Sequence, residues 1–155
     1  MIQRLQSLYL TFVLLLSLLF FCGSTLSFID ESGKVIRLMS EGTINYSDGQ
    51  YFVHFEMGWF LPATLILIPL LSLITILIFK NSKIQLLLSL AVIILSAGLI
   101  ITLSCYSCFI INKYSADIIP GFKMALPVLI LIFGILAYRG ILKDDRLIQS
   151  YDRLR

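Results

Sequence analysis

Residues 84–109 read IQLLLSLAVIILSAGLIITLSCYSCF and contain no charged side chain. A helix needs about 20 such residues to cross the hydrocarbon core of a bilayer. Three further stretches are mainly apolar, at about residues 8–28, 59–79 and 118–142. Because a membrane span must satisfy its backbone hydrogen bonds internally, each stretch is expected to be helical. The sequence therefore predicts an all-α membrane protein with a bundle of four transmembrane helices.

The composition of the whole chain agrees with a lipid environment. Hydrophobic residues make up 59% and charged residues 14% of the 155 residues, whereas soluble domains are about 45–50% apolar and roughly 25% charged. The length suits a single membrane domain, residues 1–155. A net charge of +3 without a dense basic patch gives no indication of nucleic-acid binding. The lipid bilayer is the expected surrounding.

The distribution of basic residues predicts the orientation of the spans. Loops that face the cytoplasm carry more Lys and Arg than loops on the other side. Of the 12 Lys and Arg residues, eight fall on the side that holds both termini and the tight connection at residues 80–83: Arg4, Lys80, Lys83, Arg139, Lys143, Arg146, Arg153 and Arg155. Both termini are therefore expected in the cytoplasm.

The first apolar stretch permits a second interpretation. Arg4 followed by apolar residues is also typical of a secretory signal peptide. The apolar core is long for a signal, and the bulky Phe21 before Cys22 makes a poor lipoprotein cleavage site. A retained helix is favoured over cleavage near residues 24–27.

The region between the first two spans has the pattern of a small β structure. Residues 34–39, 43–46 and 51–57 are strand-like, and the last run alternates as a half-buried strand does. Asp48 and Gly49 between two such runs favour a two-residue type I′ hairpin. We expect an extracytoplasmic antiparallel meander of three strands at about residues 33–57, whose apolar side, with Phe52 or Phe55, rests on helix ends.

The tail at residues 143–155 is expected to form a short cytoplasmic amphipathic helix that continues from the fourth span. Leu147, Tyr151 and Leu154 fall at helical spacing, while charged residues, including Arg153, fill the other face. An apolar stripe beside charge is typical of a helix that docks in a groove. Leu147, Tyr151, Arg153 and Leu154 are therefore candidates for docking a membrane or cytoplasmic protein partner.

Cys105 and Cys108 form a Cys-x-x-Cys pair at the expected outer end of the third span. Such a pair can cycle between thiols and a disulfide when the pKa of one thiol is lowered. Membrane thiol–disulfide oxidoreductases with four helices use outer cysteines in this way, but they have a second cysteine pair, and this chain has one further cysteine, Cys22. A structural disulfide and simple packing of small apolar side chains remain alternatives.

Other features of the sequence give weaker indications of function. The centres of the spans contain no ionisable residue, which disfavours a transporter. Ser89, Ser96 and Gly98 predict a close approach of the third span to a neighbouring helix. His54 and Glu56 are too few to indicate a metal site, which usually has three or four ligands. No catalytic residue, metal or cofactor is predicted.

The two ends of the chain resemble a known family. Residues 1–10, MIQRLQSLYL, and the C-terminal pieces at residues 143–145, KDD, and 150–155, SYDRLR, are similar to those of small four-helix membrane proteins of Bacteroidota catalogued as a domain of unknown function. The resemblance implies a retained first span and a location in the bacterial inner membrane. It implies no activity. The sequence thus favours a non-enzymatic accessory or scaffold subunit, with a membrane thiol–disulfide oxidoreductase as the alternative.

Overall fold

A computed structural model describes residues 3–22, 24–29, 33, 35–39, 42–47, 50–54, 60–78 and 82–152. Within these residues the chain forms four α-helices, a 3-10 helix and one five-stranded sheet. In chain order the elements are α1 (Gln3–Phe21), β1 (Ser24–Ile29), β2 (Val35–Met39), β3 (Gly42–Ser47), β4 (Gln50–His54), α2 (Phe60–Leu77), α3 (Ser82–Tyr114), β5 (Asp117–Ile119), η1 (Phe122–Ala125) and α4 (Leu126–Asp152).

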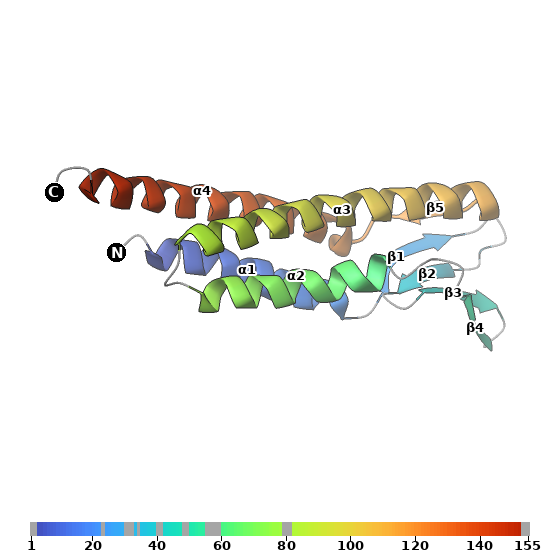
Figure 1. Cartoon of the computed structure of the whole chain (residues 1–155). Coiled ribbons are helices and arrows are strands. Elements are labelled where there is room, and N and C mark those ends of the chain that lie inside the picture. The colour runs from blue at the N-terminus through green and yellow to red at the C-terminus, as the bar shows by residue number, and fades with distance from the viewer. Residues whose placement is uncertain are drawn as a thin grey trace.

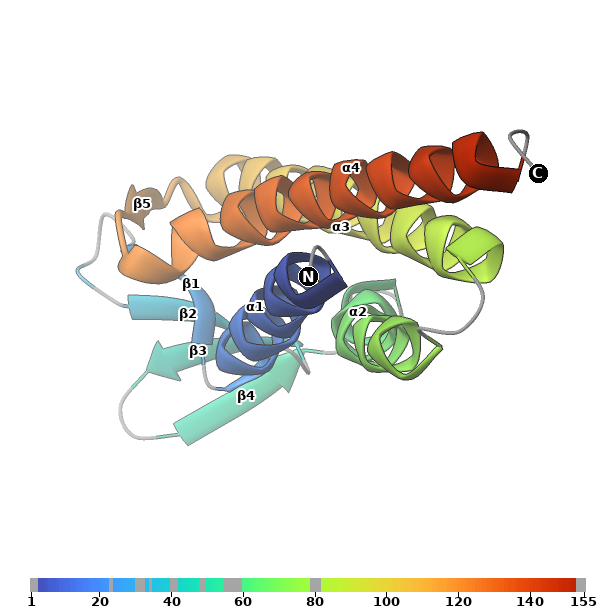
Figure 2. The ribbon, with the colours of Figure 1, turned by 90° about the vertical axis from the view of Figure 1, so that its left-hand side faces the viewer.

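The four helices lie side by side, and the sheet extends from one end of them (Figure 1). The chain runs alternately up and down through the helices, so the described N- and C-terminal ends lie together, far from the sheet. Helix α1 packs against α2 and α4, and α3 packs against α2 and α4. Figure 2 shows this arrangement from the end that carries the termini, with α3 and α4 on one side and α1 and α2 on the other.

Three helical stretches are long and apolar enough to span a membrane: Phe60–Leu77, Lys83–Asn112 and Phe122–Asp145. The apolar part of α1, Gln6–Phe21, is shorter. Only 28%, 28% and 33% of the three long stretches is buried inside the chain. Most of their apolar surface therefore faces outward.

The polar side chains between the helices are mostly hydroxyls that bond within their own helix. Ser72, Ser89 and Ser96 are buried, and each donates to a carbonyl three residues earlier at 2.8–2.9 Å. Such local bonds satisfy the hydroxyl and let neighbouring helices pack closely. The expected role of Gly98 is wrong, since a Cβ there would meet nothing within 4 Å. The closer approach is at Gly134 of α4, where an added Cβ would lie 3.5 Å from a side-chain carbon of Ile93.

The sheet has the order β4-β3-β2-β1-β5, and all neighbouring strands are antiparallel. Strands β2, β3 and β4 confirm the predicted three-strand meander. Ser47 pairs with Gln50, which confirms a two-residue connection between β3 and β4. The two residues of this turn, whose type was predicted, lie outside the described residues, as do Phe55 and Glu56. Across the sheet, Phe52 belongs to the same line of paired positions as Ile36 and Phe28.

One face of the sheet is part of the main core. Phe28, Ile36 and Leu38 are buried in the same hydrophobic cluster as Phe20 of α1 and Ile110 of α3. Because residues alternate between the two faces of a strand, the neighbours of these residues point to the opposite face. Ile29, Arg37 and Ile119 are exposed on that face.

Two boundaries of the predicted spans are wrong. The first span was expected to reach residue 28, but residues 24–29 form β1, in which β-branched and small residues separate the apolar ones. The fourth was expected to begin at residue 118, but residues 117–119 form β5 and α4 begins at Leu126. Pro120 explains this change, since the residue before a proline disfavours helical geometry. Helix α4 then continues without a break through most of the predicted tail helix.

Candidate functional site

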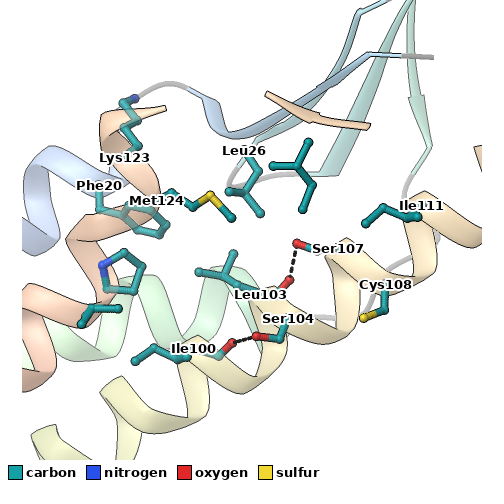
Figure 3. A pocket seen from close by; sticks show the side chains of 13 residues that line it. Phe20, Leu26, Ile100, Leu103, Ser104, Ser107, Cys108, Ile111, Lys123 and Met124 are labelled. Carbon is teal, nitrogen blue, oxygen red and sulfur yellow. Dashed lines mark hydrogen bonds between the residues drawn. The ribbon is translucent and has the colours of Figure 1, made fainter. Parts of the chain in front are cut away.

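An apolar cavity of about 310 Å³ lies where the helices meet the sheet. Figure 3 shows that α3, η1 and the start of α4 form its sides. Its inner wall consists of buried residues from α1, β1 and α3, namely Phe20, Leu26 and Leu103. Its mouth lies between exposed residues of α3 and of η1 and α4, namely Ser104, Cys108, Ile111, Met124 and Val128. The cavity thus opens sideways, between two helices.

The polar groups that line this cavity are engaged in hydrogen bonds with the backbone. The hydroxyls of Ser104 and Ser107 donate to carbonyls of their own helix, each at 2.9 Å. Among the described residues, Lys123 is the one charged residue that lines the cavity, and its Nζ donates to the carbonyl of Cys22 at 2.6 Å. That carbonyl follows the last residue of α1, where a cation interacts favourably with the helix dipole. The walls are therefore apolar, with a fixed ammonium at the edge.

The predicted cysteine pair lies on α3 near the sheet. Cys105 and Cys108 are free thiols, and both are exposed. Cys108 lines the cavity, whereas Cys105 is not among its lining residues. Cys22, also free and exposed, directly follows α1. The structure thus places all three thiols at the same end of the helices.

The other predicted candidates are only partly described. Leu147 and Tyr151 lie on α4, while Arg153 and Leu154 fall outside the described residues. His54 is the last residue of β4. Among the described residues, no group of three or more His, Cys, Asp and Glu residues is arranged to hold a metal ion.

The family model described as a domain of unknown function, DUF4293, matches residues 2–154. The chain belongs to the DUF4293 family. This match confirms the resemblance of the ends of the sequence to a family catalogued as a domain of unknown function. No curated protein and no solved structure matches the chain. Since the family description names no activity, the function has to be argued from the geometry.

Sequence reasoning missed a polar contact at the end of the helices far from the sheet. The amide Nε2 of the buried Gln6 on α1 donates to Oδ2 of Asp144 on α4. Gly140, one turn earlier on α4, makes room for this contact, since a Cβ there would lie 2.9 Å from Cγ of Gln6. The other carboxylate oxygen, Oδ1 of Asp144, is buried and has no hydrogen-bond partner among the described residues.

A second contact of this type joins α2 and α3 at the same end. The buried Gln85 donates its Nε2 to the carbonyl of Thr75 at 3.5 Å. The sequence does contain a signal for these contacts, because Gln6 and Gln85 are glutamines inside or beside an apolar run. Their partners could not be found, since Gln6 and Asp144 are 138 residues apart.

The contact between Gln6 and Asp144 predicts a stability difference. Gln6→Leu should lower the free energy of unfolding by about 1–3 kcal/mol, because it leaves a buried acceptor without a donor. The combined variant Gln6→Leu/Asp144→Leu should recover most of this loss, because both polar groups are then removed. Thermal unfolding of the detergent-solubilised chain measures both effects. Leu8→Ala, at an exposed position of the same helix, is the control; equal losses in the single and combined variants would contradict the contact.

Proposed function

We propose that the chain is a multi-pass protein of the bacterial inner membrane that crosses the bilayer four times and acts as a non-enzymatic accessory or scaffold subunit. The observation that supports this most is the distribution of polarity across the helices. Large apolar side chains are exposed on all four helices, whereas the buried hydroxyls of Ser17, Ser72, Ser89 and Ser96 bond to carbonyls of their own helices. A solvent of acyl chains stabilises that arrangement, and water does not.

Helix α1 supports the fourth crossing even though its apolar part is shorter. Its 19 residues extend about 28 Å at 1.5 Å per residue, close to the ~30 Å of hydrocarbon. It exposes Leu8, Phe12, Leu15 and Leu18 on its outer surface. Where this surface borders α4, the ring of Phe12 stacks on that of Phe133 with centroids 5.3 Å apart. It thus shares the outward apolar character of the three longer stretches.

The end that holds the termini carries the basic residues expected of a cytoplasmic side. Lys83 lies in the first turn of α3 and Lys143 in the last turns of α4, both at the end opposite the sheet. The positive-inside rule then assigns the sheet to the outer side of the membrane. The proposal also includes an origin of the chain in the Bacteroidota, which the resemblance of its two ends implies.

The sheet is the feature that favours a scaffold role on the outer side. One of its faces is buried against the helices, while Ile29, Arg37 and Ile119 are exposed on the other. A mixed apolar and charged face, held on a packed core, is suited to contact another protein. The continuous helix α4 offers a second surface on the cytoplasmic side.

Reporter fusions test the placement in the membrane. A cytoplasmic reporter joined after residue 155 should be active, and a reporter that needs the periplasm should be active when joined after Gly49. Basic residues near α3 and α4 retain that end in the cytoplasm, which is the physical reason for both outcomes. The reverse pattern, or a chain that stays dissolved without detergent, would disprove the placement.

Removal of residues 146–155 tests the scaffold role and leaves Asp144 beside Gln6. We expect the full chain, extracted in a mild detergent, to elute as a stoichiometric complex with another protein. The truncated chain should remain in the membrane and lose that protein, because the proposed docking stripe is gone. Replacing residues 146–155 with a Gly/Ser sequence of equal length is the control and should have the same effect. A full chain that elutes alone, or a complex that both variants retain, argues against a docking tail.

The second candidate function is a membrane thiol–disulfide oxidoreductase. Its supporting observation is that Cys105 and Cys108 are both free and exposed, one helical turn apart on α3. Side chains at i and i+3 on a helix are neighbours, so these thiols are candidates to form the reversible disulfide of such an enzyme.

Alkylation of the denatured chain, with and without prior reduction, tests this second candidate. If the pair cycles, a fraction of Cys105 and Cys108 should be protected from alkylation in cells and released by reductant. Cys22 serves as the internal control, because it is exposed and outside the pair. Thiols that remain reduced under oxidising growth conditions would rule out the oxidoreductase.

A further inference from the structure

We propose that the cavity between α3 and α4 binds one acyl chain of an anionic membrane phospholipid, with the lipid phosphate at Lys123. The inference rests on the proposed membrane placement, because only a span in lipid brings an acyl chain to the mouth of the cavity. It names a ligand for a site that the scaffold role does not require.

The shape of the cavity suits a chain that enters from the side. Its mouth lies between exposed residues of two helices, Cys108 on α3 and Val128 on α4, and its inner end is closed by the buried Phe20 and Leu26. A volume of about 310 Å³ is at the lower end of the ~300–1,000 Å³ of ligand pockets. This space accommodates part of one hydrocarbon chain, while the rest of the lipid remains in the bilayer.

The chemistry of the walls selects hydrocarbon. Ser104 and Ser107 use their hydroxyl protons within α3, so neither donates into the cavity. The remaining wall residues are apolar, apart from the Cys108 thiol and Lys123. A ligand with polar groups inside this space would lose hydrogen bonds to water without replacement. A saturated or singly unsaturated acyl chain loses none.

Lys123 supplies the charge that favours an anionic headgroup. The residue is half-buried, and its ammonium is held at the end of α1 by the carbonyl of Cys22. An ammonium has three donors, and among the described residues this bond uses one of them. The nearby Asp117 is exposed on β5, and the adjacent Ile118 lines the cavity. Because side chains alternate along a strand, the Asp117 carboxylate points to the other face of the sheet.

A second apolar hollow provides an internal comparison. It has about 400 Å³ and lies between α1 and α2, lined by Leu14, Leu18, Phe21, Leu65, Ile66, Pro69, Leu70 and Leu73. As far as the chain is described, its lining contains no charged residue and no residue of the sheet. Bulk lipid contacts both hollows, so a preference for the cavity at Lys123 separates specific binding from general solvation.

The test uses the full chain in lipid nanodiscs that contain a phospholipid with a photoreactive diazirine in its acyl chain. Two probes are compared, one with an anionic phosphatidylglycerol headgroup and one with zwitterionic phosphatidylcholine. We expect phosphatidylglycerol adducts at the cavity, on Met124, Cys108 and Ile111, in clear excess over adducts at Leu70 and Leu73. Lys123→Gln keeps a donor and removes the charge, and it should lower the phosphatidylglycerol adducts about fivefold, as expected for one basic group near a lipid surface.

Two matched controls make the result decisive. Lys83→Gln, at an exposed lysine at the other end of α3, should leave the cavity adducts unchanged. Ser104→Phe fills the mouth from an exposed position and should abolish them, whereas Ile101→Phe, equally exposed on α3 but outside the cavity, should not.

Several results would overturn the inference. Equal adducts in the two hollows would show general solvation, and equal yields from both probes or an unchanged yield with Lys123→Gln would exclude headgroup recognition. A chain that does not enter nanodiscs would overturn the membrane placement together with this site. A chain that enters normally but shows uniform adducts would overturn the lipid site alone.

Discussion

Phe20 and Phe28 are fully buried in one hydrophobic cluster, and their contact region joins the helices to the sheet. Phe20 is in the last turn of α1 and Phe28 is in the strand that follows after a short link. Because both belong to one core, the sheet is fixed on the helices instead of hanging from a flexible connection. The orientation of its open face, the position of Lys123 and the inner wall of the cavity all depend on this junction.

The bond from Lys123 to the carbonyl of Cys22 reinforces the same junction from the opposite side. It joins η1, which precedes α4, to the end of α1, across 101 positions of sequence. The carbonyl would otherwise be one of the unsatisfied acceptors that every helix leaves at its C-terminus. Strand β5 completes the arrangement by pairing with β1, which ties the connection between α3 and α4 to the sheet.

The sequence allowed the apolar helices and the meander to be predicted because both depend on local patterns. The span predicted from hydropathy at residues 59–79 agrees with α2 to within a few residues. The span predicted at residues 84–109 corresponds to α3, which extends further, to Tyr114. Alternation and an Asp-Gly pair located β2, β3 and β4. The same hydropathy misassigned residues 24–28 of β1 and 118–119 of β5, because an apolar strand and an apolar helix can have the same average hydropathy.

The candidate site could not be predicted from the sequence, for a different reason. The sequence drew attention to Cys105 and Cys108 as a pair, but not to Cys108 as a wall residue beside Met124 and Lys123. A cavity depends on which side chains from distant segments fail to fill a space. Here β1, α1, α3, β5 and α4 all contribute to its lining, and no local pattern predicts their meeting. The contact between Gln6 and Asp144 was hidden in the same way.

The packing of α4 along its length explains why the cavity lies near the sheet. Along the middle of the pair, Gly134 brings α4 close to Ile93, and further on Gly140 brings α4 close to Gln6 of α1. Near the sheet the residues that α3 turns toward α4 include Ser104, Ser107 and Cys108, which are too small to fill the space that η1 leaves. Protein interiors are normally packed without such voids. While such a gap is empty, its apolar walls lose the contacts that packed neighbours would give them, and an apolar occupant entering through the lateral mouth would restore those contacts.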